Sequence, residues 1–186
     1  MPLAPDSLGE SIGRPMQQGE IIIGVISDTH GLLRPQAIGA LRGCHMIIHA
    51  GDVGNPGIID QLRDIAPSFV VRGNIDKGKW ALRLPTRELV TVGRHRFLVL
   101  HKISALDLDP AAAGLAAVVF GHSHRAVVEA RNEVLFINPG SAGPRRFNLP
   151  VSVARISVSE RRICPQIVDL LTGEATSGEI PSKSKG

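Results

Sequence analysis

The stretch IIIGVISDTH, residues 21–30, determines how the rest of the chain is interpreted. Residues 21–27 form a mostly apolar run of the length of a buried strand, and the run ends directly at Asp28 and His30. A carboxylate and an imidazole two residues apart at a strand end can cap a turn, or they can hold a metal ion. The segments that follow along the chain decide between these two roles.

Strand and helix patterns alternate after this stretch. Apolar runs at 45–51 and 68–74 predict two further strands, and the segments at 34–43 and 56–66 predict helices. The first of these helices has Pro35 in its opening turn, where proline is favoured. An order of strand, helix, strand, helix, strand predicts parallel strands in one sheet.

The second half of the chain is rich in hairpins. Residues 86–92 and 95–101 flank Gly93-Arg94, which predicts a β-hairpin. Further strands are predicted at 116–122, 126–131, 133–139, 152–158 and 163–170. We therefore predict an α/β fold in which two mixed sheets pack face to face with helices outside.

The composition fits one globular domain in the cytoplasm. The chain has 186 residues, and 43% of them are hydrophobic, which is enough for a core. No segment approaches the roughly 20 apolar residues of a membrane helix, and two cysteines do not make a disulfide framework. We expect a domain at 20–172, between a flexible leader at 1–19 and a flexible tail at 173–186.

The charge balance says little about the class of ligand. A formal net charge of +4 favours anionic ligands in general. The five Phe, one Trp and no Tyr offer few rings for stacking bases, so the composition does not favour a dedicated nucleic-acid binder.

Polar side chains of one chemical kind follow five of the predicted strands. These residues are Asp28, His30, Asp52, Asn74, His101, His122 and His124. Alone, each would be an N-cap, a turn residue or a packed histidine. Together they fall where the carboxyl ends of strands in open α/β sheets line one crevice. Oxygen and imidazole ligands without thiolate suit Mn, Fe, Co, Ni or Zn, and seven ligands exceed one tetrahedral site, which indicates two ions.

The ordered motifs around these residues resemble those of the calcineurin-like metallophosphoesterases. They are Asp28-Thr29-His30, Gly51-Asp52, Gly73-Asn74-Ile75-Asp76, His101 and Gly121-His122-Ser123-His124. The likeness is greatest to the small prokaryotic phosphodiesterase branch, which is Vps29-like. Asn138-Pro139-Gly140-Ser141, followed by Pro144-Arg145, resembles the signature of that branch.

The resemblance implies a four-layer sandwich of two mixed β-sheets flanked by helices, with a binuclear metal site. The residues that would hold one ion are Asp28, His30, Asp52 and His124. Those that would hold the other are Asp52, Asn74, His101 and His122, with Asp52 bridging. The Asp-x-His spacing agrees with this, because it places both side chains on one face of the strand end.

The implied activity is that of a metal-dependent phosphodiesterase, a phosphoric ester hydrolase that cleaves P–O bonds with a hydroxide bridging two divalent ions. Asp52, Asn74 and His101 are then the expected catalytic residues, and Asn74 and Arg145 are expected to contact the substrate. We expect Mn as the metal, with Ni, Fe, Co or Zn as alternatives, and a small phosphodiester as substrate. The sequence is compatible with a homo-oligomer and with a monomer.

Two positions depart from the family pattern. Ile75 stands where many members carry a histidine that is thought to protonate the leaving group, and Lys102 stands where glycine is usual after the histidine ligand. His49, just before Gly51-Asp52, is either a support for a ligand or a packed strand-end histidine.

The alternative function is that of an interaction scaffold of the same fold with little or no catalytic activity. Loss of metal ligands would favour the scaffold. All the ligands that the family pattern requires are present, so we favour an enzyme.

Overall fold

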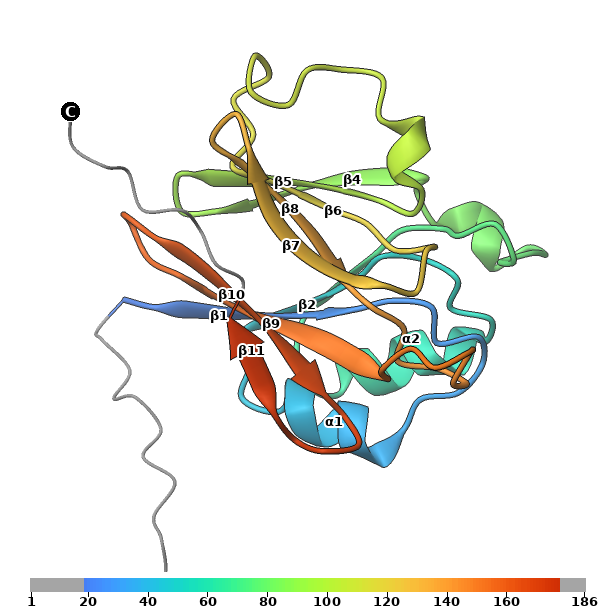
Figure 1. Cartoon of the computed structure of the whole chain (residues 1–186). Helices are drawn as coiled ribbons and strands as arrows, with labels where there is room; N and C mark the ends of the chain where they lie inside the picture. Colours follow the sequence, from blue (N-terminus) through green and yellow to red (C-terminus); the bar gives the residue numbers. More distant parts are fainter. Residues whose placement is uncertain (1–18, 178–186) are drawn as a thin grey trace, which may run out of the picture.

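The computed structural model describes residues 19–177 and arranges them as two β-sheets (Figure 1). The first sheet contains β1 (Ile21–Ile26), β2 (Met46–His49), β3 (Ser68–Val70), β9 (Ser152–Val158), β10 (Ile163–Asp169) and β11 (Ala175–Ser177). The second contains β4 (Arg87–Val92), β5 (His95–Leu100), β6 (Ala117–Val119), β7 (Ala126–Arg131) and β8 (Val134–Pro139). The strand orders are β11-β10-β9-β1-β2-β3 and β4-β5-β6-β8-β7.

The predicted parallel unit at the start of the domain is confirmed. β1 pairs with β2, and β2 with β3, in parallel register, and the crossovers contain α1 (Pro35–Leu41) and α2 (Pro56–Arg63). α2 begins where the Asn55 side chain accepts a hydrogen bond of 2.9 Å from the Gly57 N–H. The parallel pairing brings the carboxyl ends of β1, β2 and β3 to one edge of the sheet.

Both sheets are mixed, as predicted. β4 and β5 form the expected antiparallel hairpin, whereas β5, β6 and β8 pair in parallel. In the first sheet, β9 joins β1 in antiparallel register and β10 continues that pattern. The carboxyl ends of β5 and β6 therefore point in the same direction within the second sheet.

Alternate residues of β1 contribute to two cores. Ile23 and Val25 pack between the two sheets, whereas Ile26 packs in the core shared with α1 and α2. Gly24 faces α1 as well, and a Cβ added there would lie 2.5 Å from Leu41 Cδ2. The absence of a side chain at this position lets the helix approach the strand closely.

The predicted fold class is confirmed, with one refinement of the outer layers. Within residues 19–177, α-helices cover the first sheet only. The outer face of the second sheet is covered by the segment between β5 and β6, from which Leu106 and Leu115 pack against that sheet. This segment contains η2 (Ile103–Ala105) as a single 3-10 turn. A longer helix is not expected there, because Pro110 and Gly114 interrupt it.

The C-terminal boundary needs a correction. Residues 175–177, which we predicted to belong to a flexible tail, form β11 and pair with β10 in antiparallel register. The three residues of β11 carry no apolar alternation, so their pairing left no pattern in the sequence. Residues 1–18 and 178–186, which make up most of the predicted leader and tail, lie outside the described residues.

The helices of the described part are short. Besides α1 and α2 they comprise η2 and η1 (Ala81–Arg83), which lies between β3 and β4. None of the helices within residues 19–177 has the length and apolar character needed to cross a membrane.

Candidate metal centre

The predicted ligands follow the ends of five strands and converge in two groups. We call Asp28, His30 and His124 the first group, and Asp52, His101 and His122 the second group. Within each group, one potential ligand atom from each side chain lies within 4.8 Å of the others. These strands belong to both sheets, so the convergence depends on how the two sheets pack.

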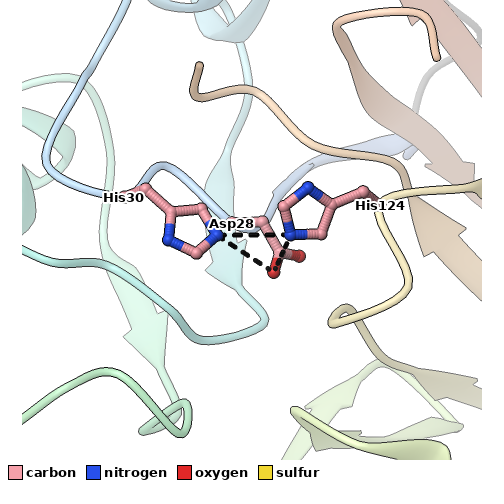
Figure 2. Close-up of side chains that lie close together, drawn as sticks. All are labelled: Asp28, His30 and His124. Atoms are coloured by element: carbon pink, nitrogen blue, oxygen red, sulfur yellow. Dashed lines mark hydrogen bonds and ion pairs between the residues drawn. The ribbon is translucent and has the colours of Figure 1, made fainter. Parts of the chain in front are cut away.

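The three side chains of the first group point toward one another (Figure 2). The Nε2 atoms of His30 and His124 are 3.2 Å apart. Asp28 Oδ1 lies 3.2 Å from Nε2 of His124 and 3.8 Å from Nε2 of His30. Two nitrogen lone pairs and a carboxylate oxygen therefore meet at one point, which is the donor set that a divalent transition metal prefers.

The second group has a similar donor set with an added amide. Asp52 Oδ1 is 3.3 Å from His101 Nε2, and the His101 and His122 ring centroids are 5.2 Å apart. Asn74 joins this group, because its Oδ1 lies 3.2 Å from His101 Nε2. Nitrogen and oxygen ligands again meet without thiolate.

Asp52 lies between the two groups. Its Oδ1 faces His101 of the second group, and its Oδ2 lies 3.9 Å from Nε2 of His30 in the first group. A carboxylate with one oxygen toward each group has the geometry needed to bridge two ions.

An unsatisfied oxygen gives a test of whether these residues fit a cation. Asp28 is fully buried. Its Oδ2 accepts hydrogen bonds from Ser27 Oγ at 2.6 Å and from the His122 N–H at 3.0 Å. Among the described residues, Asp28 Oδ1 and His124 Nδ1 are the buried side-chain atoms that have no hydrogen-bond partner. A buried carboxylate oxygen that accepts no hydrogen bond is costly, and a cation bound between it and the two histidine nitrogens would remove that cost, so the residues fit a metal ion.

The protonation states of four predicted ligands suit metal binding as well, whereas burial raises the pKa of Asp28. Burial lowers the pKa of His30, His122 and His124, which keeps these imidazoles neutral and their lone pairs free. Burial acts to raise the pKa of Asp52, but hydrogen bonds from His101 and from the Ile75 N–H outweigh it and lower the pKa to about 2. Asp52 is therefore an anion at neutral pH.

His101 is oriented by the backbone. Its Nδ1 lies 2.7 Å from Ala50 O, and because a carbonyl can only accept, Nδ1 carries the hydrogen. Nε2 then faces Asp52 and Asn74. Burial acts to lower the pKa of His101, but the hydrogen bonds with Asp52 and Ala50 raise it. A histidine held through Nδ1 by a carbonyl is typical of metal sites.

The backbone at the ligands is left-handed, which the sequence did not indicate. Positive φ values occur at Asp28 (54°), His30 (48°), Asp52 (56°), His122 (69°) and His124 (58°). Such values are uncommon for residues other than glycine and cost free energy. Strained backbone of this kind collects at functional sites, where neighbouring contacts hold it in place.

His49 supports two of the ligand-bearing loops. It is fully buried, and this burial lowers its pKa to about 4. Its Nδ1 accepts a hydrogen bond of 3.1 Å from the Gly51 N–H, and its Nε2 lies 2.9 Å from Thr29 Oγ1. Thr29 Oγ1 in turn donates to Val53 O at 3.0 Å. His49 is thus both buried and in contact with the loops that carry Asp28 and Asp52.

Sequence reasoning missed Asp76 as a supporting residue. Its carboxylate is buried and accepts hydrogen bonds of 2.8 Å from the N–H groups of Gly54 and Gly73. These two glycines lie on the loops that follow β2 and β3. The motif Gly73-Asn74-Ile75-Asp76 was the available signal, but the spacing does not reveal the partner at Gly54.

Arg145, the predicted substrate contact, is followed by a second arginine, Arg146. Arg145 is exposed. After burial, the nearby charge of Arg146 is the largest influence lowering the pKa of His124, and it lowers the pKa of His30 as well. Arg146 is therefore close enough to the first group for its charge to act on both histidines.

Comparison with known proteins identifies relatives of the whole domain. A model of the calcineurin-like phosphoesterase superfamily domain matches residues 21–161. A probable metallophosphoesterase of Methanocaldococcus jannaschii is 31% identical over 159 residues, which are 77% of this chain and 79% of that protein. The phosphodiesterase YfcE of Escherichia coli strain K12 is 26% identical over 150 residues, 68% of this chain and 82% of YfcE.

A solved structure extends the likeness of fold. Vacuolar protein sorting 29 from Cryptosporidium parvum superposes with a TM-score of 0.74 at 18% identity. The match covers 86% of this chain and 96% of that protein. At this identity the likeness concerns the fold alone.

Proposed function

This chain belongs to the calcineurin-like phosphoesterase superfamily, and we propose that it is a metal-dependent phosphodiesterase that hydrolyses a small phosphodiester in the cytoplasm. The observation that carries the proposal is the position of Asp52 between two complete ligand groups. The relatives named as metallophosphoesterase and phosphodiesterase support the class of reaction.

We assign the ligands as the family pattern implies. Asp28, His30 and His124 would hold one ion, and Asn74, His101 and His122 the other, with Asp52 shared. When bound, the two ions would supply water activated at neutral pH and positive charge for the phosphoryl oxygens. The nitrogen and oxygen donor set suits Mn, our first choice, as well as Ni, Fe, Co or Zn.

The residues of the chain have separate tasks in this reaction. Asp52 connects the two groups, since its Oδ1 lies 3.3 Å from His101 Nε2 and its Oδ2 lies 3.9 Å from His30 Nε2, and the contact with His101 holds the carboxylate in place. Asn74 is exposed, and its Oδ1 faces His101, so its amide N–H groups are free to donate to a phosphoryl oxygen. Arg146 adds positive charge beside the first group, and Arg145, the residue before it, would contact the substrate phosphate.

The second candidate function is an interaction scaffold with little or no catalytic activity. Its support is the likeness of fold to vacuolar protein sorting 29. The complete ligand set favours the enzyme, because the buried Asp28 oxygen that accepts no hydrogen bond would be satisfied by a bound ion.

Hydrolysis assays distinguish the two candidates. Phosphomonoesters, phosphodiesters and cyclic nucleotides are compared with each divalent ion, and the Asp52→Asn variant serves as the control. We expect diesters to be hydrolysed fastest, and we expect the rate to fall to the background level in the variant. A protein that carries two ions and hydrolyses none of these esters would be a scaffold.

A further inference from the structure

The segment Asn138-Pro139-Gly140-Ser141, which we call the NPGS segment, contacts the loops that carry the ligands of the first group. It lies at the end of β8, and Asn138 and Ser141 are both buried. The assignment of metal ligands leaves these residues without a role. Their hydrogen bonds supply one.

Asn138 holds the loop that carries two histidine ligands. Its Nδ2 donates to Gly121 O at 2.9 Å and to Ser123 Oγ at 3.1 Å, so the amide contacts both sides of His122. Its Oδ1 accepts from the Gly140 N–H at 2.9 Å. Because both ends of the amide are bonded, its orientation is fixed, and the position of the loop before His124 is fixed with it.

Ser141 holds the loop that carries Asp28. Its Oγ donates to Asp28 O at 3.0 Å, and the N–H of the following Ala142 donates to Ser27 O at 3.0 Å. At Gly143, two residues after Ser141, an added Cβ would lie 2.5 Å from Asp28 O. The chain after the NPGS segment thus packs directly against the backbone of the ligand.

The second group has a different support. Asp76 accepts hydrogen bonds from Gly54 and Gly73, on the loops that carry Asp52 and Asn74. Of the side chains in the second group, only His122 lies on a loop that the NPGS segment contacts. The NPGS segment and Asp76 therefore contact different ligand loops, while backbone hydrogen bonds from Asp28 N–H to Gly51 O and from His30 N–H to Asp52 O, each 3.0 Å, join the loops of the two groups.

We propose that Asn138 and Ser141 are positioning residues for the first group, and that they set the affinity for one of the two ions. The inference rests on the metal centre of the proposed function. The first group takes its ligands from two loops of different sheets, and Asn138 and Ser141 bond to one loop each. Residues that orient metal ligands typically account for about 10–100-fold in metal affinity.

The test measures Mn²⁺ affinity in two backgrounds that each retain one group. His122→Ala removes a ligand of the second group, and His124→Ala removes one of the first. In the His122→Ala background, we expect Ser141→Ala or Asn138→Ala to lower the affinity for the remaining Mn²⁺ by about 10–100-fold. In the His124→Ala background, we expect Ser141→Ala and Asn138→Ala each to weaken Mn²⁺ binding less than in the His122→Ala background.

A matched control reverses the pattern. Asp76→Asn keeps the size of the side chain but removes one acceptor, so it should weaken Mn²⁺ mainly in the His124→Ala background. Ser141→Thr keeps the hydroxyl and should restore the affinity that Ser141→Ala loses. When Ser141→Ala or Asn138→Ala is made alone, the Mn²⁺ electron paramagnetic resonance signal should change from that of a coupled pair of ions to that of an isolated ion.

The outcomes separate this inference from the proposed centre. Equal losses in both backgrounds, or no rescue by Ser141→Thr, would show that the NPGS segment supports folding in general and would overturn the inference. An unaltered protein that binds fewer than two Mn²⁺ would overturn the proposed centre, and this inference with it. Ser141→Ala removes a single hydrogen bond, so it tests the idea even where Asn138→Ala does not fold.

Discussion

Asp52 differs from the other candidate ligands because its two carboxylate oxygens face different groups of side chains. Oδ1 lies near His101, and Oδ2 lies nearer to His30. Each remaining ligand belongs to one group only, and His49 acts through hydrogen bonds to the ligand-bearing loops. Single residues of this centre should therefore differ in how much activity depends on them.

We expect Asp52→Asn to lower kcat by more than either Asn74→Ala or His49→Gln. The loss at Asp52 should reach at least about 10²–10³-fold, because a charged group aimed at the reacting centre disappears. A change at His49 acts only by displacing ligands and should cost about 10–100-fold. Steady-state kinetics at saturating Mn, with metal content measured on the same samples, provides the comparison. Equal losses at Asp52 and His49 would show that the shared carboxylate has been misassigned.

Ile75 predicts a dependence on the leaving group. It is 39% exposed, and it occupies the position of the histidine that many superfamily members carry. Neither His95 nor Asp76 replaces that histidine. His95 Nε2 lies 2.9 Å from Ser159 O, at the opposite end of β5 from His101, and the Asp76 carboxylate is engaged with two backbone N–H groups.

Aryl phosphodiesters should therefore react much faster than alkyl ones, with rates that rise as the leaving-group pKa falls. A general acid typically contributes about 10²–10⁴-fold, so Ile75→His should raise the rates for poor leaving groups and flatten the dependence. Ile75→Val serves as the control that keeps an apolar side chain. If the unaltered enzyme showed no dependence while chemistry limits its rate, another acid would already be present.

At the scale of elements, β1 shows how much the sequence could predict and where prediction stopped. Its apolar run and the polar residues after it were enough to predict the strand, the parallel neighbours and the position of Asp28 at the strand end. The left-handed backbone at Asp28 was not predictable, because it depends on hydrogen bonds from distant loops. The same reason hid the pairing of β11 and the contacts of Asp76, since non-local partners leave no local pattern.

The packing of α1 on β1 leads to a paired prediction. Gly24→Ala should destabilise the protein by about 1–3 kcal/mol, because its Cβ would overlap Leu41 in a filled core. Gly39 lies on the exposed side of α1, where an added Cβ would have no neighbouring atom within 4 Å, so Gly39→Ala should stabilise by about 0.4–1 kcal/mol. Urea unfolding of the two variants measures both values. A Gly24→Ala protein as stable as the parent would mean that Leu41 moves aside without cost.

For the whole molecule, metal binding and folding are coupled. The ligand groups exist only in the folded chain, since their residues are separated by long stretches of sequence. A ligand that binds only the folded state adds about 2.7 kcal/mol of stability when present at a hundred times its dissociation constant.

Metal content should therefore approach two ions per chain, and removal of metal by a chelator should lower the melting temperature. Thermal unfolding with Mn, with EDTA and with EDTA followed by excess Mn measures the effect and its reversal. A stoichiometry that stays at one ion under saturating Mn would contradict the binuclear assignment, and an unchanged melting temperature would contradict the coupling.

The origin of the ligands has a consequence for internal motion. The first group joins Asp28 and His30, after β1, to His124, after β6 of the other sheet. The second group likewise joins Asp52 to His101, after β5. Each ion would then cross-link the two sheets, and any sliding of one sheet over the other would lengthen ligand contacts in both groups at once. Shear between the sheets and escape of the metal thus become a single event, and the loaded protein should be the stiffer one.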